Sequence, residues 1–489
     1  MEVFGLVFLA IYPLLFHFLS RLDSRFYFRV ICFFPSLIFA YMGVQSFLQE
    51  STFQFFGLKV DALSGLIATF VSAIGMIVTR FSIRYLEDDP RRDEFFRNIS
   101  FALSSVLVAL MANNFALFFG ALLSSSFFLH HLLTHFKERK EAKKAAVQKF
   151  WISRMGDAFF LISILLILMS IGSLNFDVIF ERVQNPELLK KHQVSLFFAS
   201  LMMVAGVLTR SAQVPFHYWL PNTMETPTPV SALMHAGIIN SGGYLLIRMS
   251  PFLAEFPFAL NLLALIGALT AFYGSLVMMT QTDVKKALAY STISQMGFMM
   301  LQCGVGAFSI ATAHLIGHAS YKAYAFLSSG TITEFGRLQR YYPKDRKEVA
   351  FVQQFLSLAL SSMILFVISS ALNVNLAAKP GALILSLILT LCMAQILLSS
   401  YSFLRKVFYS SFICTIYFAV YSVIRPLLSD FIFVGRVYEG WQNQVLSLSI
   451  GLFFVALFFI QNNLKLLSRT SLGERLYVWL YFRGVMSKS

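Results

Sequence analysis

Long apolar runs separated by short polar segments recur along the whole chain. Each run is roughly 20 residues long, the length of a helix that crosses a bilayer. Backbone polar groups inside lipid must be satisfied within the segment, which favours helices, and the runs lack the polar alternation of a membrane β-barrel. The pattern therefore predicts an all-α polytopic membrane protein with about 14–15 transmembrane helices. The predicted spans start near Met1, Phe26, Asp61, Phe95, Asn113, Trp151, Ser195, Pro227, Phe258, Asp283, Gly306, Val349, Ala382, Val407 and Gln442.

The composition agrees with this pattern. Of the 489 residues, 57% are hydrophobic and 13% are charged, whereas about 25% of the residues of a soluble domain are charged. The net charge of +15 is typical of nucleic-acid binding, but basic residues in a membrane protein first report topology. We therefore expect membrane lipids, and no nucleic acid, around this chain.

The cysteines give no sign of a metal or disulfide framework. They lie in or beside apolar spans, and no CxxC or Cys/His pair occurs. Small apolar core residues are the expected role, and no disulfide, zinc site or iron–sulfur site is predicted in this chain. The four positions are Cys32, Cys303, Cys392 and Cys414.

Basic residues concentrate after the odd-numbered spans. The segments 135–149, after the fifth span, and 337–347, after the eleventh, carry the largest groups of lysine and arginine. The positive-inside rule then places these segments in the cytoplasm and the N-terminus outside, as in a multi-pass protein of a bacterial inner membrane. The two segments are candidate docking surfaces for a partner; the alternative is that they only set the topology.

The seventh span ends in a stretch that cannot be one continuous helix. It reads "VLTRSAQVPFHYWLPNTMETPTPVSALMHAGIINSGGYLLIR", residues 207–248. Its several prolines predict a break after Arg210 and a new helix from about Pro227. Interrupted helices in a bilayer often line ion paths, but an ordinary loop with a re-entrant turn would give the same pattern. In the new helix, His235 and Asn240 lie among apolar residues and glycines that permit close helix packing.

Three ionisable residues share one face of the eleventh span. His314, His318 and Lys322 are spaced four apart in "ATAHLIGHASYKAYAF". On a helix this spacing gives a slightly twisted stripe about 12 Å long. Charged groups in a membrane are costly and usually face an interior polar path, and histidine titrates near neutral pH. The row therefore predicts proton transfer from group to group, with water bridging each step.

Other roles are compatible with these residues. The two histidines resemble a metal or haem pair, but a haem would need a further histidine on a facing helix, and His235 alone does not establish one. Lys322 at the membrane surface is the second alternative, although the apolar segment continues beyond it. In the sixth span, Arg154 and Asp157 are three apart, which predicts an ion pair on one helix face.

Three segments carry a resemblance to a known family. They read "RSAQVPFHYWLPNTMETPTPVSALMHAG", "TQTDVKKALAYSTISQMGFM" and "HLIGHASYKAYAFLSSG". They resemble the proton-conducting membrane transporters, which include the antiporter-like subunits of respiratory complex I and the Mrp cation/proton antiporters. The resemblance runs from about Asp61 to Gly330 and is specific, because several long motifs occur in the family's order.

The resemblance implies two inverted five-helix repeats, each with a broken helix, and a polar axis along the membrane centre. The family's relay in span 11 falls on the row that starts at His314, with Lys322 as its central lysine. Its span-8 histidine falls on His235, and its span-6 Arg/Asp pair falls on Arg154 and Asp157. The implied divisions are N-terminal helices over 1–94, a first repeat over 95–257, a second repeat over 258–404 and C-terminal helices over 405–489.

The chain departs from the family pattern at three places. Where complex I subunits carry a glutamate in span 5, this chain has Leu122, so Asp157 becomes the best remaining acidic partner. The span-7 lysine is Arg210, and because arginine stays charged at any working pH it is a poor proton carrier. Span 12 offers Gln353 and Gln354 but no charge, so the familiar exit of the second half is not visible.

Within the family, "METPTPVSALMHAGIINSGGYLLIR" and "YKAYAFLSSG" look most like the DabB membrane subunits of DAB inorganic carbon transporters. The resemblance implies a transport subunit, not an enzyme, that conducts protons or sodium and energises a DabA-like partner related to β-carbonic anhydrases. It implies no cofactor in this chain, with zinc expected in the partner. The alternatives are a proton-pumping subunit of an NADH–quinone oxidoreductase and an Mrp-type antiporter component. The expected pathway residues are His235, His314, His318, Lys322, Asp157 and Arg210.

Overall fold

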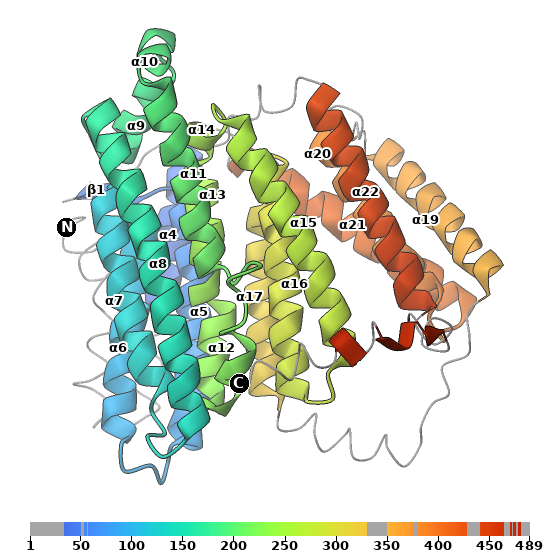
Figure 1. Ribbon diagram of the computed structural model, residues 1–489, viewed down its shortest axis with the longest axis horizontal. Helices are drawn as coiled ribbons and strands as arrows, with labels where there is room; N and C mark the ends of the chain where they lie inside the picture. The colour runs from blue at the N-terminus through green and yellow to red at the C-terminus, as the bar shows by residue number, and fades with distance from the viewer. Residues whose placement is uncertain are drawn as a thin grey trace.

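The computed structural model of the chain is a single assembly of long helices that run roughly side by side (Figure 1). The helices from α5 to α14 form one side, α15 to α17 lie in the middle, and α19 to α22 form the other side. The residues that the structure describes are 34–49, 53–55, 57–329, 350–372, 374, 380–427, 441–463 and short pieces between 470 and 480.

The elements follow one another as long helices with a few short connecting pieces. The first half contains α4 (Phe34–Gln49), β1 (Phe53–Phe55), β2 (Leu58–Val60), α5 (Ala62–Tyr85), α6 (Arg92–Met111), α7 (Phe115–Leu133), α8 (Lys140–Ile171), α9 (Phe176–Val183), α10 (Pro186–Lys191), α11 (Gln193–Arg210), η3 (Pro221–Glu225), α12 (Thr228–Ala236), η4 (Ile238–Asn240), α13 (Ser241–Arg248) and α14 (Ser250–Leu253). The second half contains α15 (Pro257–Thr280), α16 (Val284–Gly304), α17 (Phe308–Leu327), α19 (Phe351–Ala371), α20 (Pro380–Leu397), α21 (Phe403–Leu427) and α22 (Trp441–Asn462).

The predicted fold class is confirmed. In the described part of the chain, ten helices are long and apolar enough to cross a membrane. Most predicted spans from Asp61 onward begin within a few residues of an observed helix, because the apolar runs set both. The predicted span at Met1 and the basic segment 337–347 lie outside the described residues. The divisions at 94, 257 and 404 fall in the first turns of α6, α15 and α21, and the repeat organisation stays a prediction.

The sixth span begins earlier than predicted. The sequence suggested a loop over 135–149 and a helix from about Trp151, but α8 already starts at Lys140. The reason is local, because the segment from Lys140 is rich in alanine, lysine and glutamate, which favour helix. The basic segment is therefore largely helical.

The helix break after Arg210 is present, and a second break follows it. Helix α11 ends at Arg210, the short helix η3 follows, and α12 begins after Pro227 as predicted. The span then breaks again at Gly237, where a 3-10 turn over Ile238–Asn240 separates α12 from α13. The sequence pattern predicts only a packing role for this glycine. In the predicted second repeat, α19 runs unbroken over Phe351–Ala371.

Helices α15 and α16 pack with their backbones in contact. A Cβ atom on Gly274 of α15 would lie 2.7 Å from Ser294 N of α16, and a Cβ on Gly297 of α16 would lie 2.7 Å from Gly267 O of α15. Small residues allow such approach in membranes, where apolar burial between helices gives little drive. Ser294 Oγ adds a bond to the backbone oxygen of Ala271, 2.9 Å away. The two helices form a tight pair.

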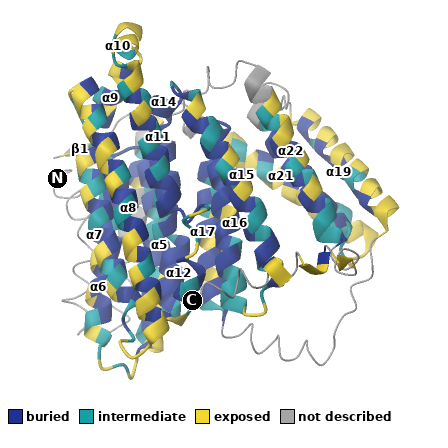
Figure 2. Cartoon of the chain, in the orientation of Figure 1, coloured by how far each residue is buried: buried dark blue, intermediate teal, exposed yellow. Residues whose placement is uncertain are grey.

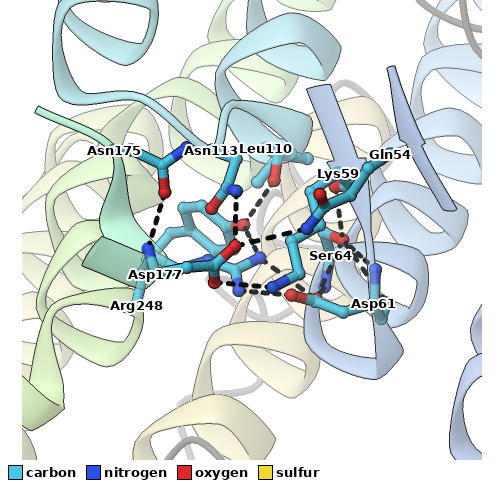
Figure 3. A network of polar contacts seen from close by, with 10 residues as sticks. Gln54, Lys59, Asp61, Ser64, Leu110, Asn113, Asn175, Asp177 and Arg248 are labelled. Atoms are coloured by element: carbon cyan, nitrogen blue, oxygen red, sulfur yellow. Dashed lines mark hydrogen bonds and ion pairs between the residues drawn. The ribbon is translucent and has the colours of Figure 1, made fainter. Parts of the chain in front are cut away.

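A buried ion pair joins α5 to α13. Arg248 Nη1 donates to Asp61 Oδ2 at 2.5 Å, and Arg248 Nη2 donates to Asp61 Oδ1 at 3.1 Å. The Asp61 carboxylate also caps α5 by accepting from Ser64 N at 2.9 Å, and Tyr244 donates to the backbone oxygen of Leu110. Figure 3 shows these residues converging from α5, α6 and α13. The network ties the N-terminal helices to the broken span.

A second, more exposed ion pair lies beside the first (Figure 3). Lys59 Nζ, from β2, donates to Asp177 Oδ1 of α9 at 2.6 Å, and Asn113 Nδ2 donates to Asp177 Oδ2 at 2.7 Å. Burial opposes ionisation of Asp177, but these bonds and the charge of Lys59 outweigh it and hold the carboxyl pKa below its usual range. This contribution to stability is therefore present at neutral pH and is lost as the pH falls through the lowered pKa.

The C-terminal helices expose much apolar surface. Only 22% of the most apolar segment of each of α19, α21 and α22 is buried within the chain. Figure 2 shows α19 largely exposed on its outer side, whereas α5, α12 and α16 are largely buried. Exposed apolar surface on a membrane helix is expected to face lipid or another membrane subunit.

The Asp61→Asn substitution is expected to destabilise the protein by about 3–5 kcal/mol, because it leaves the Arg248 charge buried without its carboxylate partner. Thermal unfolding of the full chain in detergent measures the effect. Asp177→Asn is the control, because the Asp177 side chain is 44% exposed, against 1% for Asp61, and removing an exposed pair costs less than about 1 kcal/mol. Equal shifts for the two variants would contradict the prediction.

Candidate functional site

The row of ionisable residues on α17 faces the protein interior, and burial increases from its first residue to its last. Lys322 is fully buried, His318 is buried, and His314 is half-buried. The ring centroids of His314 and His318 lie 6.1 Å apart, which matches one helical step of about 6 Å. The side chains that the sequence placed on one stripe therefore point into the helix assembly and not toward lipid.

Helix α16 supplies the partners of this row. Lys322 Nζ donates to the backbone oxygen of Leu288 at 2.9 Å, and His314 Nδ1 lies 2.8 Å from Gln302 Oε1. Leu288 is near the start of α16 and Gln302 near its end, so α16 and α17 run antiparallel with their polar groups matched along the length. The row is held by hydrogen bonds at both ends.

His235 joins the row from α12. The residue is fully buried, its Nδ1 lies 3.0 Å from Thr292 Oγ1 of α16, and its ring stacks on Phe326 of α17 with centroids 4.2 Å apart. Phe326 is one turn beyond Lys322, so the histidine sits at the lysine end of the row. The structure thus brings His235 and Lys322 together, although they lie far apart in the sequence.

A separate charged cluster lies between α8 and α11. Asp157 forms an ion pair with Arg154, with Arg154 Nη2 2.7 Å from Asp157 Oδ2, and a second one with Arg210 through Oδ1. Asp157 and Arg210 are buried, whereas Arg154 is partly exposed. The single carboxylate is therefore clamped between two guanidinium groups. Leu122, at the position of the missing glutamate, is buried and lines a small apolar cavity of about 30 Å³.

Several buried polar atoms in the row on α17, and between that row and the Asp157 cluster, lack a protein partner among the described residues. Both ring nitrogens of His318 and Nε2 of His235 make no hydrogen bond there. Two side-chain oxygens near the helix breaks, Gln213 Oε1 and Asn240 Oδ1, are also without a partner. Buried polar groups are normally satisfied by protein or by ordered water. Their grouping around the breaks favours a hydrated path through this part of the protein.

The two clusters are not directly bonded. Within the described part of the chain, no hydrogen bond or ion pair links Asp157 or Arg210 to the row on α17. Arg210 ends α11, and the turn that follows it holds Ser211, whose Oγ donates to the backbone oxygen of Ile239 at 3.2 Å. The break after Arg210 and the break at Gly237 are therefore in contact, between the Asp157 cluster and the row on α17.

Sequence reasoning missed the groups that hold the row. Thr292 and Gln302 belong to a span predicted only as apolar helix, and the backbone oxygen of Leu288 has no sequence signature. One signal was available, because a glutamine and a threonine inside a span need partners of their own. Which histidine each would meet depends on how the helices pack.

Comparison with known families agrees with this arrangement. The family model described as "NADH:quinone oxidoreductase/Mrp antiporter, TM" matches residues 109–413, and the model for the N-terminus of complex I chain 5 matches residues 48–96. The first match covers more than half of the chain. The chain belongs to the NADH:quinone oxidoreductase/Mrp antiporter family. The predicted family membership is thereby confirmed.

Individual members of the family show how far the likeness extends. The probable inorganic carbon transporter subunits DabB2 and DabB1 of Halothiobacillus neapolitanus are 38% and 34% identical, over 71% and 67% of this chain and 62% and 61% of theirs. NADH-ubiquinone oxidoreductase chain 5 of Metridium senile is 36% identical over 57% of this chain and 46% of its own. The chain thus spans about three fifths of the length of the first two relatives.

Solved structures of the family share the fold. A chain of the Mrp complex from Dietzia sp. superposes with a TM-score of 0.63 at 20% identity, over 99% of this chain and 59% of that one. A chain of the membrane-bound sulfane sulfur reductase, an archaeal respiratory membrane complex, gives a TM-score of 0.58 at 16% identity over the full length of both. The antiporter-like fold therefore extends through the C-terminal helices.

The Thr292→Val substitution is expected to destabilise the protein by about 1–3 kcal/mol, because it leaves His235 Nδ1 buried without a partner. Thermal unfolding in detergent measures the loss. Thr312→Val is the matched control, since the Thr312 hydroxyl is equally buried but bonds only the Phe308 oxygen of its own helix. An equal or larger loss in the control would show that Thr292 does not hold His235.

Proposed function

We propose that this chain is the cation-conducting membrane subunit of a two-component inorganic carbon uptake complex. The proposal is supported by the likeness to DabB subunits, whose names describe inorganic carbon transport. The conducted cation is a proton or sodium, and its inward flow energises a DabA-like, zinc-binding partner of the carbonic anhydrase type. We place the protein in a bacterial inner membrane with its N-terminus outside.

One observation carries the proposal. Lys322, His318 and His235 are buried together between α12, α16 and α17. Burying a lysine and two histidines costs free energy, which a purely structural helix avoids. Their position side by side in one row is the arrangement expected for stepwise cation transfer.

The row supports a simple transfer scheme. Lys322 Nζ is a donor that gives up a proton and takes one back, and neutral His318 accepts a proton on a ring nitrogen that has no protein partner in the described residues. His314 extends the route along α17, and His235 faces the lysine end from α12. Water bridges the steps that the side chains do not span.

The charged cluster acts on this route through its electric field. Arginine does not release its proton at working pH, so Arg210 and Arg154 pair with Asp157 and do not carry protons themselves. We propose that Asp157 takes the part of the missing acidic residue in the first half of the protein. The chemistry of CO2 and bicarbonate belongs to the partner, where zinc generates the hydroxide nucleophile.

A second candidate function rests on another relative. The likeness to NADH-ubiquinone oxidoreductase chain 5 supports a proton-pumping subunit of a redox enzyme. Purification of the intact complex from native membranes separates the two. A large zinc protein in the complex supports carbon uptake, whereas further subunits of an NADH–quinone oxidoreductase support the alternative.

The Lys322→Ala variant is expected to abolish carbon-dependent growth. A host that lacks carbonic anhydrase, expressing this chain with its partner, is grown in ambient air, and the protein level in membranes is measured in parallel. Proton transfer by a positioned group contributes roughly 10²–10⁴-fold to rate, so the residual uptake is too small to support growth. His318→Ala is expected to be nearly as severe.

Two further variants sharpen this test. Lys322→Arg keeps the positive charge but removes the ability to release a proton, so it is expected to fail like Lys322→Ala. Lys191→Ala removes an exposed lysine at the end of α10 and is expected to grow normally. Wild-type growth of Lys322→Ala at a normal membrane level would refute the proposed role of the row.

The Asp157→Asn variant is expected to lower uptake at least about tenfold, because two arginines then lie beside a neutral amide. The rate of inorganic carbon uptake into cells measures it, normalised to the amount of protein in the membrane. An unchanged rate would show that Asp157 does not replace the missing acidic residue.

A further inference from the structure

Lys149 of α8 is buried in contact with α7. The residue is 4% exposed, and its Nζ donates to both the hydroxyl and the backbone oxygen of Ser126, at 2.6 and 3.1 Å. It lies on one stripe of α8 with Ala145, Ile152 and Gly156, all of them buried. The sequence pattern predicts a loop position for this lysine. Lys140, Lys143 and Lys144, earlier on the same helix, are exposed.

His130 lies beside this lysine on the same face of α7. It is one helical turn beyond Ser126, and its ring lies near the backbone of Ala146, one turn before Lys149. The ring Nδ1 of His130 is buried and makes no hydrogen bond among the described residues. The histidine is half-buried and close to the end of α7, so it lies between Lys149 and the protein surface at the α7–α8 junction.

Lys149 also lies within electrostatic range of the Asp157 cluster. Arg154, Arg210 and Asp157 each act on its charge. Lys149 lies eight residues before Asp157 on α8, about 12 Å along the helix axis. With its ammonium included, this region holds three cations and one carboxylate, a net charge of 3 − 1 = +2. Both arginines keep their protons. Lys149 is therefore the member of this group that can relieve the excess positive charge by releasing a proton.

From this juxtaposition we propose that Lys149 is a proton-carrying residue that links the surface at the α7–α8 junction to the buried Asp157–Arg210 pair. In this step an N–H bond of the ammonium breaks and the proton passes to the His130 side. The neutral amine then takes a proton from water on the Asp157 side and regains its bond to Ser126. The proposal rests on the proposed inward cation flow and adds a proton release point at the cytoplasmic end of the first half of the protein.

The first test separates proton transfer from structural bonding. Lys149→Gln is expected to lower proton flux in proteoliposomes roughly 100-fold, as for loss of a positioned proton-transfer group. Lys149→Arg keeps a charged donor for Ser126 but cannot release its proton, and it is expected to fail equally. Lys191→Gln, at an exposed lysine that ends α10, is expected to be unchanged. Normal flux through Lys149→Arg would overturn the proposal.

The second test uses chemical rescue of the full chain. Lys149→Cys is placed in a background whose four native cysteines are replaced by alanine, and the thiol is treated with bromoethylamine, which restores an amine one sulfur atom different from lysine. We expect at least half of the flux to return, with the alkaline limb of the pH profile moved to lower pH because the sulfur makes the amine more acidic. Return of flux with an unmoved profile would overturn the proposal.

The third test measures water access to position 149 and does not depend on transport. An impermeant thiol reagent is expected to modify Lys149→Cys in membrane vesicles from the α7–α8 side only, and Lys144→Cys serves as the exposed control on that side. No reaction at position 149 from either side, with position 144 labelled, would overturn the proposal. If wild-type proteoliposomes show no flux at all, the proposed function fails, and the labelling alone decides whether position 149 is reached by water.

Discussion

An ionisable group inside the helix assembly is costly to bury unless it finds a partner, because lipid offers none. Helix α16 supplies such partners to Lys322 and His314 of α17 and to His235 of α12. The backbone oxygen of Leu288, the hydroxyl of Thr292 and the amide of Gln302 lie along it and bond Lys322, His235 and His314. Without these three groups, the lysine and the histidines would be too costly to bury. The position of α16 therefore determines whether the row can exist.

The protein satisfies its two charged regions in different ways. The row on α17 contains groups that change protonation in the proposed function, and its bonds are to neutral partners that tolerate either form. The cluster on α8 and α11 is held by direct ion pairing of two arginines with the single carboxylate of Asp157, which leaves one positive charge in excess. Groups of the first kind suit transfer, since no bond demands a fixed charge. Groups of the second kind suit a constant electric field that biases transfer nearby.

The apolar runs were sufficient to predict most of the helices, because a bilayer imposes one length on every span. The row His314, His318 and Lys322 was equally visible, since it depends only on spacing within one helix. The start of α8 at Lys140 was missed because a run of basic residues is typical of a loop, although the alanines between them favour helix. The break at Gly237 was missed because glycine is common both in breaks and in packing contacts. The partners Thr292 and Gln302 depend on tertiary packing, which no pattern within one span encodes.

The backbone contact between α15 and α16 has a consequence for how a path through the protein can open. Glycine-to-backbone contacts leave no side chains that could rearrange while one helix slides past the other. Helices α15 and α16 are then expected to move as one rigid unit. A movement that admits or expels an ion would come instead from the interrupted helix α12–α13, which can bend at Gly237. Rate-limiting opening would thus be sensitive to substitutions at that hinge and insensitive to those that only stiffen the α15–α16 pair.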